Sequence, residues 1–129
     1  MSHAISFVVP LVPPSVNTYT RHSKGRHFKT AETEAFERAM ATFCRGHRCV
    51  GEKFSVRLDV YFGPKQARDV DNLPKCVLDG IAKNGVLVNR NGEPLSDNHV
   101  DELTVRKWST DRKNPRTEIT VRALTGVTQ

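Results

Sequence analysis

The sequence predicts one domain of the α/β (α+β) class, a small single-layer mixed β-sheet flanked by two helices. Apolar residues alternate with polar ones in some segments and recur at helical spacing in others, in the order β-α-β-α-β-β. The chain has 129 residues, the size of a single domain, and its hydrophobic content of 37% is typical of a globular protein. We therefore expect residues 1–129 to form one domain.

The first part of the chain predicts a strand, a long loop and a helix. Residues 5–11 are apolar and β-branched, as strands are, and Pro10 indicates a strand end or an edge strand. Residues 12–29 are rich in turn-forming and basic residues and show no helical period, so we expect a loop. Thr30 is the expected N-cap of a helix that Gly46 can end. One face of that helix is apolar: Phe36, Met40, Phe43 and Cys44.

The second part predicts a strand, a helix and two further strands. Residues 54–62 carry an apolar side chain at every second position, which is typical of a half-buried strand. Residues 73–84 have apolar side chains at helical spacing, and we expect a second helix there. Two strands are expected at residues 99–108 and 117–124.

The charges are unevenly distributed along a basic chain. The formal net charge is +6 and the pI is about 9.6, which is typical of proteins that bind polyanions. Residues 68–102 hold seven acidic and four basic residues, so this segment carries −3 and the remainder of the chain +9. An acidic cation site within a phosphate-binding protein would produce this distribution. Acidic residues that only neutralise neighbouring basic ones would produce it too.

Asp69 and Asp71 are the centre of the acidic segment. If the chain is extended there, both carboxylates point to the same side, and Mg²⁺ prefers such oxygen ligands. Asp97 precedes a predicted strand and could join them, while Lys75 could reduce the repulsion between the carboxylates and reach a phosphate. In the structural alternative, Asp71 or Asn72 caps the second helix and Asp69 pairs with an arginine.

Several other classes of protein find little support. No apolar run is long enough to cross a bilayer and no signal peptide is evident, so we expect no membrane association and a cytoplasmic location. The three cysteines show no disulfide framework, as expected in a reducing compartment. Cys44, His47 and Cys49 lack the Cys-x-x-Cys spacing that zinc sites prefer. No Ser, Cys or Tyr has a base placed to make it a nucleophile, which disfavours a covalent intermediate.

Five elements of the sequence together resemble the RusA family of Holliday junction resolvases. They are Pro13-Pro14-Ser15-x-Asn17-x-Tyr19, Arg21-His22-x-x-Gly25-Arg26, Arg68-Asp69-Val70-Asp71-Asn72-Leu73-x-Lys75, Leu78-Asp79-Gly80-Ile81 and Asp97-x-x-Val100. The resemblance covers nearly the whole chain in order and spacing. It implies a mixed-sheet α/β domain that forms a homodimer and resolves four-way DNA junctions by paired symmetric nicks, in DNA recombination and repair.

The resemblance also implies the site residues. It assigns Asp69, Asp71 and Asp97 as catalytic metal ligands for Mg²⁺ or Mn²⁺ and Lys75 as the catalytic lysine. Family members usually have two consecutive acidic residues where this chain has Ser96-Asp97, so Asp101 is the alternative third carboxylate.

The basic residues are the expected contacts to DNA phosphates. The candidates are Arg21, Lys24, Arg26, Lys29 and Arg68. Two other functions remain open on the sequence alone. A nucleic-acid-binding module without catalytic activity, or a protein whose basic face binds an acidic protein partner, would have a similar composition.

Overall fold

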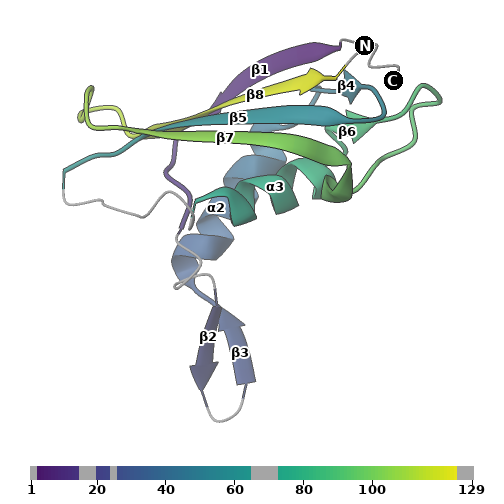
Figure 1. Cartoon of the computed structure of the whole chain (residues 1–129). Helices are drawn as coiled ribbons and strands as arrows, with labels where there is room; N and C mark the ends of the chain where they lie inside the picture. The colour runs from purple at the N-terminus through teal and green to yellow at the C-terminus, as the bar shows by residue number, and fades with distance from the viewer. Residues whose placement is uncertain (1–2, 15–19, 24–25, 65–72, 125–129) are drawn as a thin grey trace.

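A four-stranded mixed sheet is the main element of the computed structural model, which describes residues 3–14, 20–23, 26–64 and 73–124. The strand order is β1-β8-β5-β7. The strands are β1 (Ala4–Val9), β5 (Phe54–Tyr61), β7 (Val100–Trp108) and β8 (Arg116–Ala123). β8 is antiparallel to both β1 and β5, whereas β7 is parallel to β5. Figure 1 shows helices α2 (Ala31–Phe43) and α3 (Pro74–Lys83) on the same face of the sheet.

Strand β5 lies inside the sheet because its apolar side chains alternate without interruption. Phe54, Val56, Leu58 and Val60 are fully buried, and their polar neighbours point to the opposite face. The prediction for this strand is therefore confirmed, and so are the two later strands, which begin and end within one residue of the predicted positions. Strand β1 is an edge strand that ends just before Pro10, as that proline indicated.

The two helices bury the stripes that the sequence predicted, with one exception. Thr30 caps α2, because its Oγ1 accepts a hydrogen bond of 3.2 Å from the amide of Thr33. Phe36 and Met40 of α2 are buried. Phe43, which shares the predicted apolar face, remains 40% exposed at the last residue of the helix.

The helices approach each other closely at Gly80 of α3. A Cβ atom at this position would lie 2.7 Å from Cε of Met40, closer than two carbon atoms can pack. Glycine is helix-destabilising in general, but here it allows the helix axes to come together. Helix α3 then buries Cys76, Val77 and Ile81.

Two pairs of short strands were not predicted. Residues 20–23 and 26–29, expected as loop, form an antiparallel hairpin of β2 (Thr20–Ser23) and β3 (Arg26–Lys29) that projects from the body in Figure 1. Strands β4 (Cys49–Val50) and β6 (Leu87–Val88) pair in parallel beside the main sheet. Strands of two residues are too short for an alternating pattern to show, and their pairing depends on contacts between distant parts of the chain. None of the helices within the described ranges is long and apolar enough to span a membrane.

Candidate functional site

Several of the predicted site residues lie outside the described residues. Asp69, Asp71, Arg68 and Lys24 belong to this group, and the side chains of Arg21, Arg26 and Lys29 are likewise not described. The elements before and after the central motif are described: β5 ends at Tyr61 and α3 begins at Pro74. The prediction that Asp69 and Asp71 share a cation with Asp97 therefore stays a prediction.

The start of α3 excludes one structural explanation for the central motif. The N-cap of this helix is Leu73, which makes no side-chain capping hydrogen bond, and Pro74 occupies the first turn. The alternative in which Asp71 or Asn72 caps the helix is therefore wrong. The prediction that Asp71 lies one helical turn before Lys75 concerns a residue outside the described ones and stays a prediction.

Lys75 lies in the first turn of α3 with its side chain 54% exposed. Its Nζ is 3.4 Å from Oδ2 of Asp79, one turn further along the helix. The first turn contains no acidic residue, so Lys75 adds its positive charge to the positive end of the helix dipole. A lysine at this end is unfavourable for the helix alone but favourable for an approaching anion.

Asp97 begins the short 3₁₀ helix η2 (Asp97–His99), directly before β7. Oγ of Ser96 caps this turn by accepting a hydrogen bond of 3.3 Å from the amide of Asn98. Among the contacts of the described residues, no hydrogen bond or ion pair uses the Asp97 carboxylate. Asp101, the alternative, is within 3.8 Å of Nζ of Lys53. Asp97 is therefore the better placed of the two to accept a cation.

Helix α3 and η2 are in contact, so the segment with Asp97 packs against the helix that follows the central motif. The ion pair described for Lys75 is with Asp79, not with Asp97. Within the described ranges, no three His, Cys, Asp or Glu side chains form a group that could hold a metal ion. That finding does not test the predicted metal ligands, because two of them, Asp69 and Asp71, lie outside the described residues.

The cysteines and His47 have structural roles instead. Burial raises the pKa of the Cys44 thiol to about 11, although the nearby charge of Arg48 acts in the opposite direction. Cys49 lies 3.4 Å from the carbonyl oxygen of His3, and His47 stacks on Phe7 with ring centroids 4.7 Å apart. These side chains contribute to the core and its boundary.

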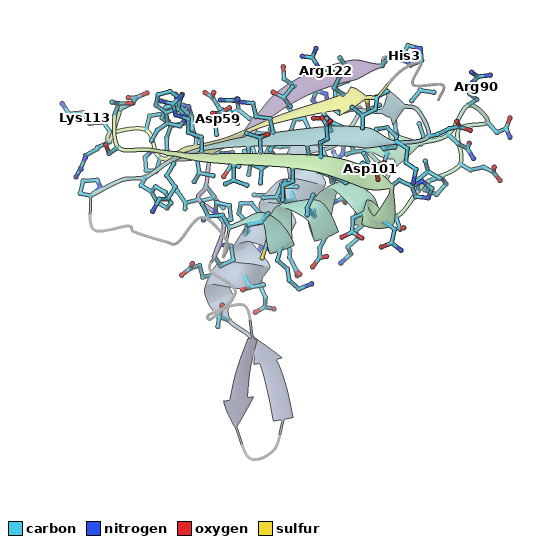
Figure 2. All side chains as sticks on the ribbon, in the orientation of Figure 1. His3, Asp59, Arg90, Asp101, Lys113 and Arg122 are labelled. Carbon is cyan, nitrogen blue, oxygen red and sulfur yellow. The ribbon has the colours of Figure 1, made fainter. Side chains whose placement is uncertain are left out.

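A polar cluster on the open face of the sheet was not predicted. Figure 2 shows Asp59 on the face opposite the helices. Its carboxylate accepts hydrogen bonds from Nε of Arg57 and Nε1 of Trp108, each 2.9 Å long. Burial raises the pKa of Asp59, but these hydrogen bonds and the charges of Arg57 and Arg106 outweigh it, so the pKa lies below its ordinary value. The alternating pattern placed Asp59 on this face, and only the pairing of β5 with β7 brings Trp108 to it.

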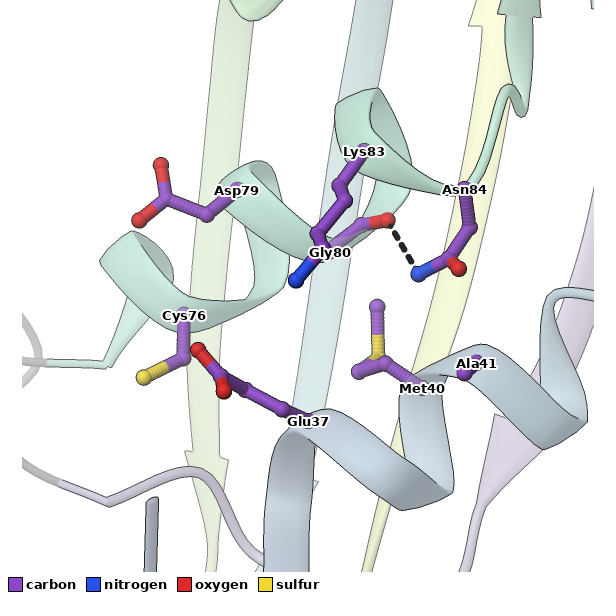
Figure 3. Close-up of a pocket in the computed structure, with 8 residues that line it drawn as sticks. All are labelled: Glu37, Met40, Ala41, Cys76, Asp79, Gly80, Lys83 and Asn84. Carbon is purple, nitrogen blue, oxygen red and sulfur yellow. Dashed lines mark hydrogen bonds between the residues drawn. The ribbon is translucent and has the colours of Figure 1, made fainter. Parts of the chain in front are cut away.

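A pocket of about 190 Å³ lies between α2 and α3. Figure 3 shows Glu37, Met40, Cys76 and Lys83 among the residues that line it. Asp79, the partner of Lys75, also lines the pocket. The predicted catalytic residues among the described ones, Lys75 and Asp97, do not line it.

Comparison with known proteins identifies the class to which this sheet-and-helix domain belongs. The family model described as "Endodeoxyribonuclease RusA" matches residues 10–122, which include every predicted site residue. The chain therefore belongs to the RusA family, as its motifs implied.

Curated relatives come from a phage and from bacteria. The chain is 32% identical to "Crossover junction endodeoxyribonuclease rusA" of Enterobacteria phage 82 over 76 residues, which are 57% of this chain and 63% of the relative. It is 30% identical to the protein of that name from Escherichia coli strain K12, again over 76 residues that are 57% of this chain and 63% of the relative. A relative from Escherichia coli O139:H28 is 29% identical over 98 residues, 74% of this chain and 80% of its own length. The first two matches thus cover somewhat less than two thirds of those relatives.

Proposed function

We propose that the protein is a metal-dependent, structure-specific endodeoxyribonuclease that resolves four-way DNA junctions by paired symmetric nicks. The observation that carries this proposal is the match to the endodeoxyribonuclease family over residues 10–122, which spans the Asp69–Lys75 motif and Asp97. The relatives are named crossover junction endodeoxyribonucleases, which agrees with it. Such an enzyme would act in DNA recombination and repair.

The donor set suits a hard divalent cation. Asp69, Asp71 and Asp97 supply only carboxylate oxygens, which Mg²⁺ and Mn²⁺ prefer over softer ions. The Asp97 carboxylate makes no described hydrogen bond or ion pair, so no neighbour in the described part of the chain competes for it. A bound cation would supply a nucleophilic water near neutral pH and neutralise negative charge on the phosphate. The three aspartates would hold it, directly or through water.

Lys75 contributes electrostatic stabilisation to this reaction. Its ammonium group carries a positive charge at the positive end of α3, where a phosphate is attracted. Negative charge grows on the attacked phosphate as the reaction proceeds, and a positioned cation is most effective when it meets charge that develops in the transition state. The contact with Asp79 holds the ammonium group near the helix while leaving the side chain half exposed.

The basic hairpin of β2 and β3 and the segment after β5 would bind the DNA. Figure 1 shows this hairpin projecting beyond the helices, away from the sheet, which is a suitable position for an arm that reaches along a duplex. Four of the five candidate phosphate contacts come from its sequence, Arg21, Lys24, Arg26 and Lys29, and the fifth is Arg68. Each phosphate contact releases counterions, so the affinity should fall steeply with salt.

The substrate also suggests the assembly and the location. A four-way junction has approximate two-fold symmetry, and two equivalent nicks require two equivalent sites, which a homodimer provides. The DNA of a bacterium or of an infecting phage lies in the cytoplasm, so we place the protein there.

The test is the cleavage of a synthetic four-way junction. We expect the wild-type protein to nick the junction with Mg²⁺ or Mn²⁺, to leave a linear duplex of the same sequence intact, and to stop when EDTA is added. Asp71→Asn should bind the junction but not nick it. Junction binding by the wild type without any metal-dependent nicking would contradict the proposal and favour a non-catalytic nucleic-acid-binding module instead.

A further inference from the structure

Strand β7 forms an edge of the main sheet, and it is exposed along most of its length. Its inner side pairs with β5, and within the described residues no strand pairs with its outer side. Six of its nine residues are exposed, from Asp101 to Thr104 together with Arg106 and Lys107. In Figure 1, β7 is the front strand of the sheet. An unpaired edge of this length exposes backbone donors and acceptors that readily pair with another strand.

The sequence of β7 is complementary to itself in the antiparallel direction. Its first half is acidic, with Asp101 and Glu102, and its second half is basic, with Arg106 and Lys107. If two copies pair around Thr104, Glu102 faces Arg106 of the second copy, and Asp101 faces Lys107. The same register places Leu103 opposite Val105. Opposite charges and apolar pairs that face each other across two strands stabilise their pairing.

The faces of the sheet agree with this register. Leu103 and Val105 stand beside Val56 and Leu58 of β5, which are fully buried on the helix-covered face. Leu103 nevertheless keeps 43% of its surface exposed, because no described element covers it at the edge. Glu102 and Arg106 stand on the open face, where neither has an ion pair described within the chain. A shift of the register by two residues would keep the faces but remove both charge pairs.

We propose that two copies of this chain associate through their β7 edges, in an antiparallel pair centred on Thr104, to form one continuous eight-stranded sheet. This proposal rests on the homodimer of the proposed function and says which surface forms it. It does not require the protein to be an active nuclease. The two-fold axis passes through the Thr104 pair, perpendicular to the sheet, so the helices of both copies lie on the same face. This is an isologous interface, in which the same residues act on both sides.

The other edge of the sheet is a poorer candidate. Strand β1 also has an exposed apolar side chain, since 45% of Val8 is accessible. The strand contains no charged residue that could select one register or one partner. Only β7 combines an exposed apolar residue with charges of opposite sign in its two halves.

The decisive experiment is a charge swap followed by measurement of the molar mass by sedimentation equilibrium over a concentration series. We expect the wild type to be a dimer. Glu102→Lys and Arg106→Glu each place like charges opposite one another at two symmetric positions, so each should weaken the dimer about tenfold or more. The double variant Glu102→Lys/Arg106→Glu restores opposite charges and should dimerise within about threefold of the wild type.

Two controls separate the interface from folding. Arg122→Glu makes the same charge change as Arg106→Glu at an exposed position of β8, inside the sheet, and should leave the dimer unchanged. Arg106 also stacks over the Trp108 ring, with 3.8 Å between the guanidinium carbon and the ring centroid. Arg106→Glu and the double variant both lose this stacking. If the double variant dimerises and Arg106→Glu does not, the difference must come from charge pairing and not from the lost stacking.

The outcomes distinguish this surface from the nuclease proposal. A monomeric wild type, or single reversals that dimerise as well as the wild type, would overturn the β7 interface whatever the nicking activity. A dimer that responds to the charge swap as expected but does not nick junctions would support the interface and contradict the nuclease function.

Discussion

The indole Nε1 of Trp108 donates a hydrogen bond of 2.9 Å to Oδ1 of Asp59, across the parallel pair of β7 and β5. Trp108 also stacks on Tyr61, with ring centroids 5.5 Å apart and an interplanar angle of 8°. Arg116 lies over the Tyr61 ring at 3.8 Å. The open face of the sheet is thus held by a connected set of polar and aromatic contacts that ties three strands together.

The Asp59 carboxylate should make stability dependent on pH. Because its pKa in the folded protein lies below its ordinary value, its stabilisation is fully present above the ordinary carboxyl pKa of about 4 and is lost as the pH falls through the lowered value. Asp59→Asn should therefore reduce the free energy of unfolding by about 1–2 kcal/mol at pH 7. It should also flatten the acid limb of the stability curve, as measured by urea unfolding between neutral pH and about pH 2.

Asp101→Asn is the control for Asp59→Asn. This carboxylate is about half exposed and its contact with Lys53 is 3.8 Å long, so the change should cost less than about 0.5 kcal/mol. Equal effects of the two substitutions would show that the hydrogen bonds of Asp59 contribute nothing special.

Gly80→Ala should test the close approach of α2 and α3. Alanine is favoured over glycine inside a helix by about 1 kcal/mol, but its Cβ would lie 2.7 Å from Cε of Met40. Overpacking of this kind costs about 1–3 kcal/mol, so we expect a net loss of roughly 1 kcal/mol in thermal or urea unfolding. In a Met40→Ala background the contacts to Cε and Cγ are gone and only Cβ, 3.2 Å away, remains, so Gly80→Ala should cost clearly less than in the wild type. Destabilisation of equal size in both backgrounds would refute the steric explanation.

Most of the main sheet and both helices could be predicted because their signals are local. The alternation in β5, the Thr30 cap and the apolar stripe around Met40 each follow from neighbouring residues. The exposure of Phe43 could not be predicted, because helical spacing does not show where the covering sheet ends. The hairpin of β2 and β3 was missed because its sequence is basic and rich in turn-forming residues. No alternation of apolar and polar residues marks its strands, which are defined only by their antiparallel pairing.

The candidate site could be predicted only as a set of residue types in a motif. From the spacing alone, Asp71 could have been the N-cap of the second helix. The N-cap of α3 is instead Leu73, directly before Pro74. The ion pair of Lys75 with Asp79 follows from their spacing of four residues once the helix is known. The relation of Asp59 to Trp108 could not be predicted, since the two residues are 49 positions apart and meet only through strand order.

Lys75→Ala should abolish nicking while junction binding is retained. The ammonium group is expected to stabilise charge in the transition state, and removal of one such contact lowers the rate by about 100-fold or more. The measurement is single-turnover cleavage of a labelled four-way junction together with its dissociation constant. Equal loss of binding and cleavage would assign Lys75 to DNA anchoring instead.

Asp79→Asn is the matched variant for the lysine. It removes the partner of Lys75 but not the ammonium group itself, so nicking should remain within a few-fold of the wild type. The exposed pair contributes little, and the free energy of unfolding should change by less than about 0.5 kcal/mol. A loss of activity as large as that of Lys75→Ala would show that the contact, and not the charge, is what the reaction requires.

Asp97→Asn and Asp101→Asn should separate the two candidates for the third carboxylate. The Asp97 carboxylate makes no hydrogen bond or ion pair among the described residues, whereas Asp101 lies 3.8 Å from Lys53. Removing a metal ligand should therefore abolish Mg²⁺-dependent nicking in Asp97→Asn and leave it nearly unchanged in Asp101→Asn. Titration of nicking against Mn²⁺ adds a second readout, because a weakened site should need a higher metal concentration. If Asp101→Asn is the inactive variant, the third ligand lies at the start of β7 rather than in η2, and Ser96-Asp97 is only the cap of that turn.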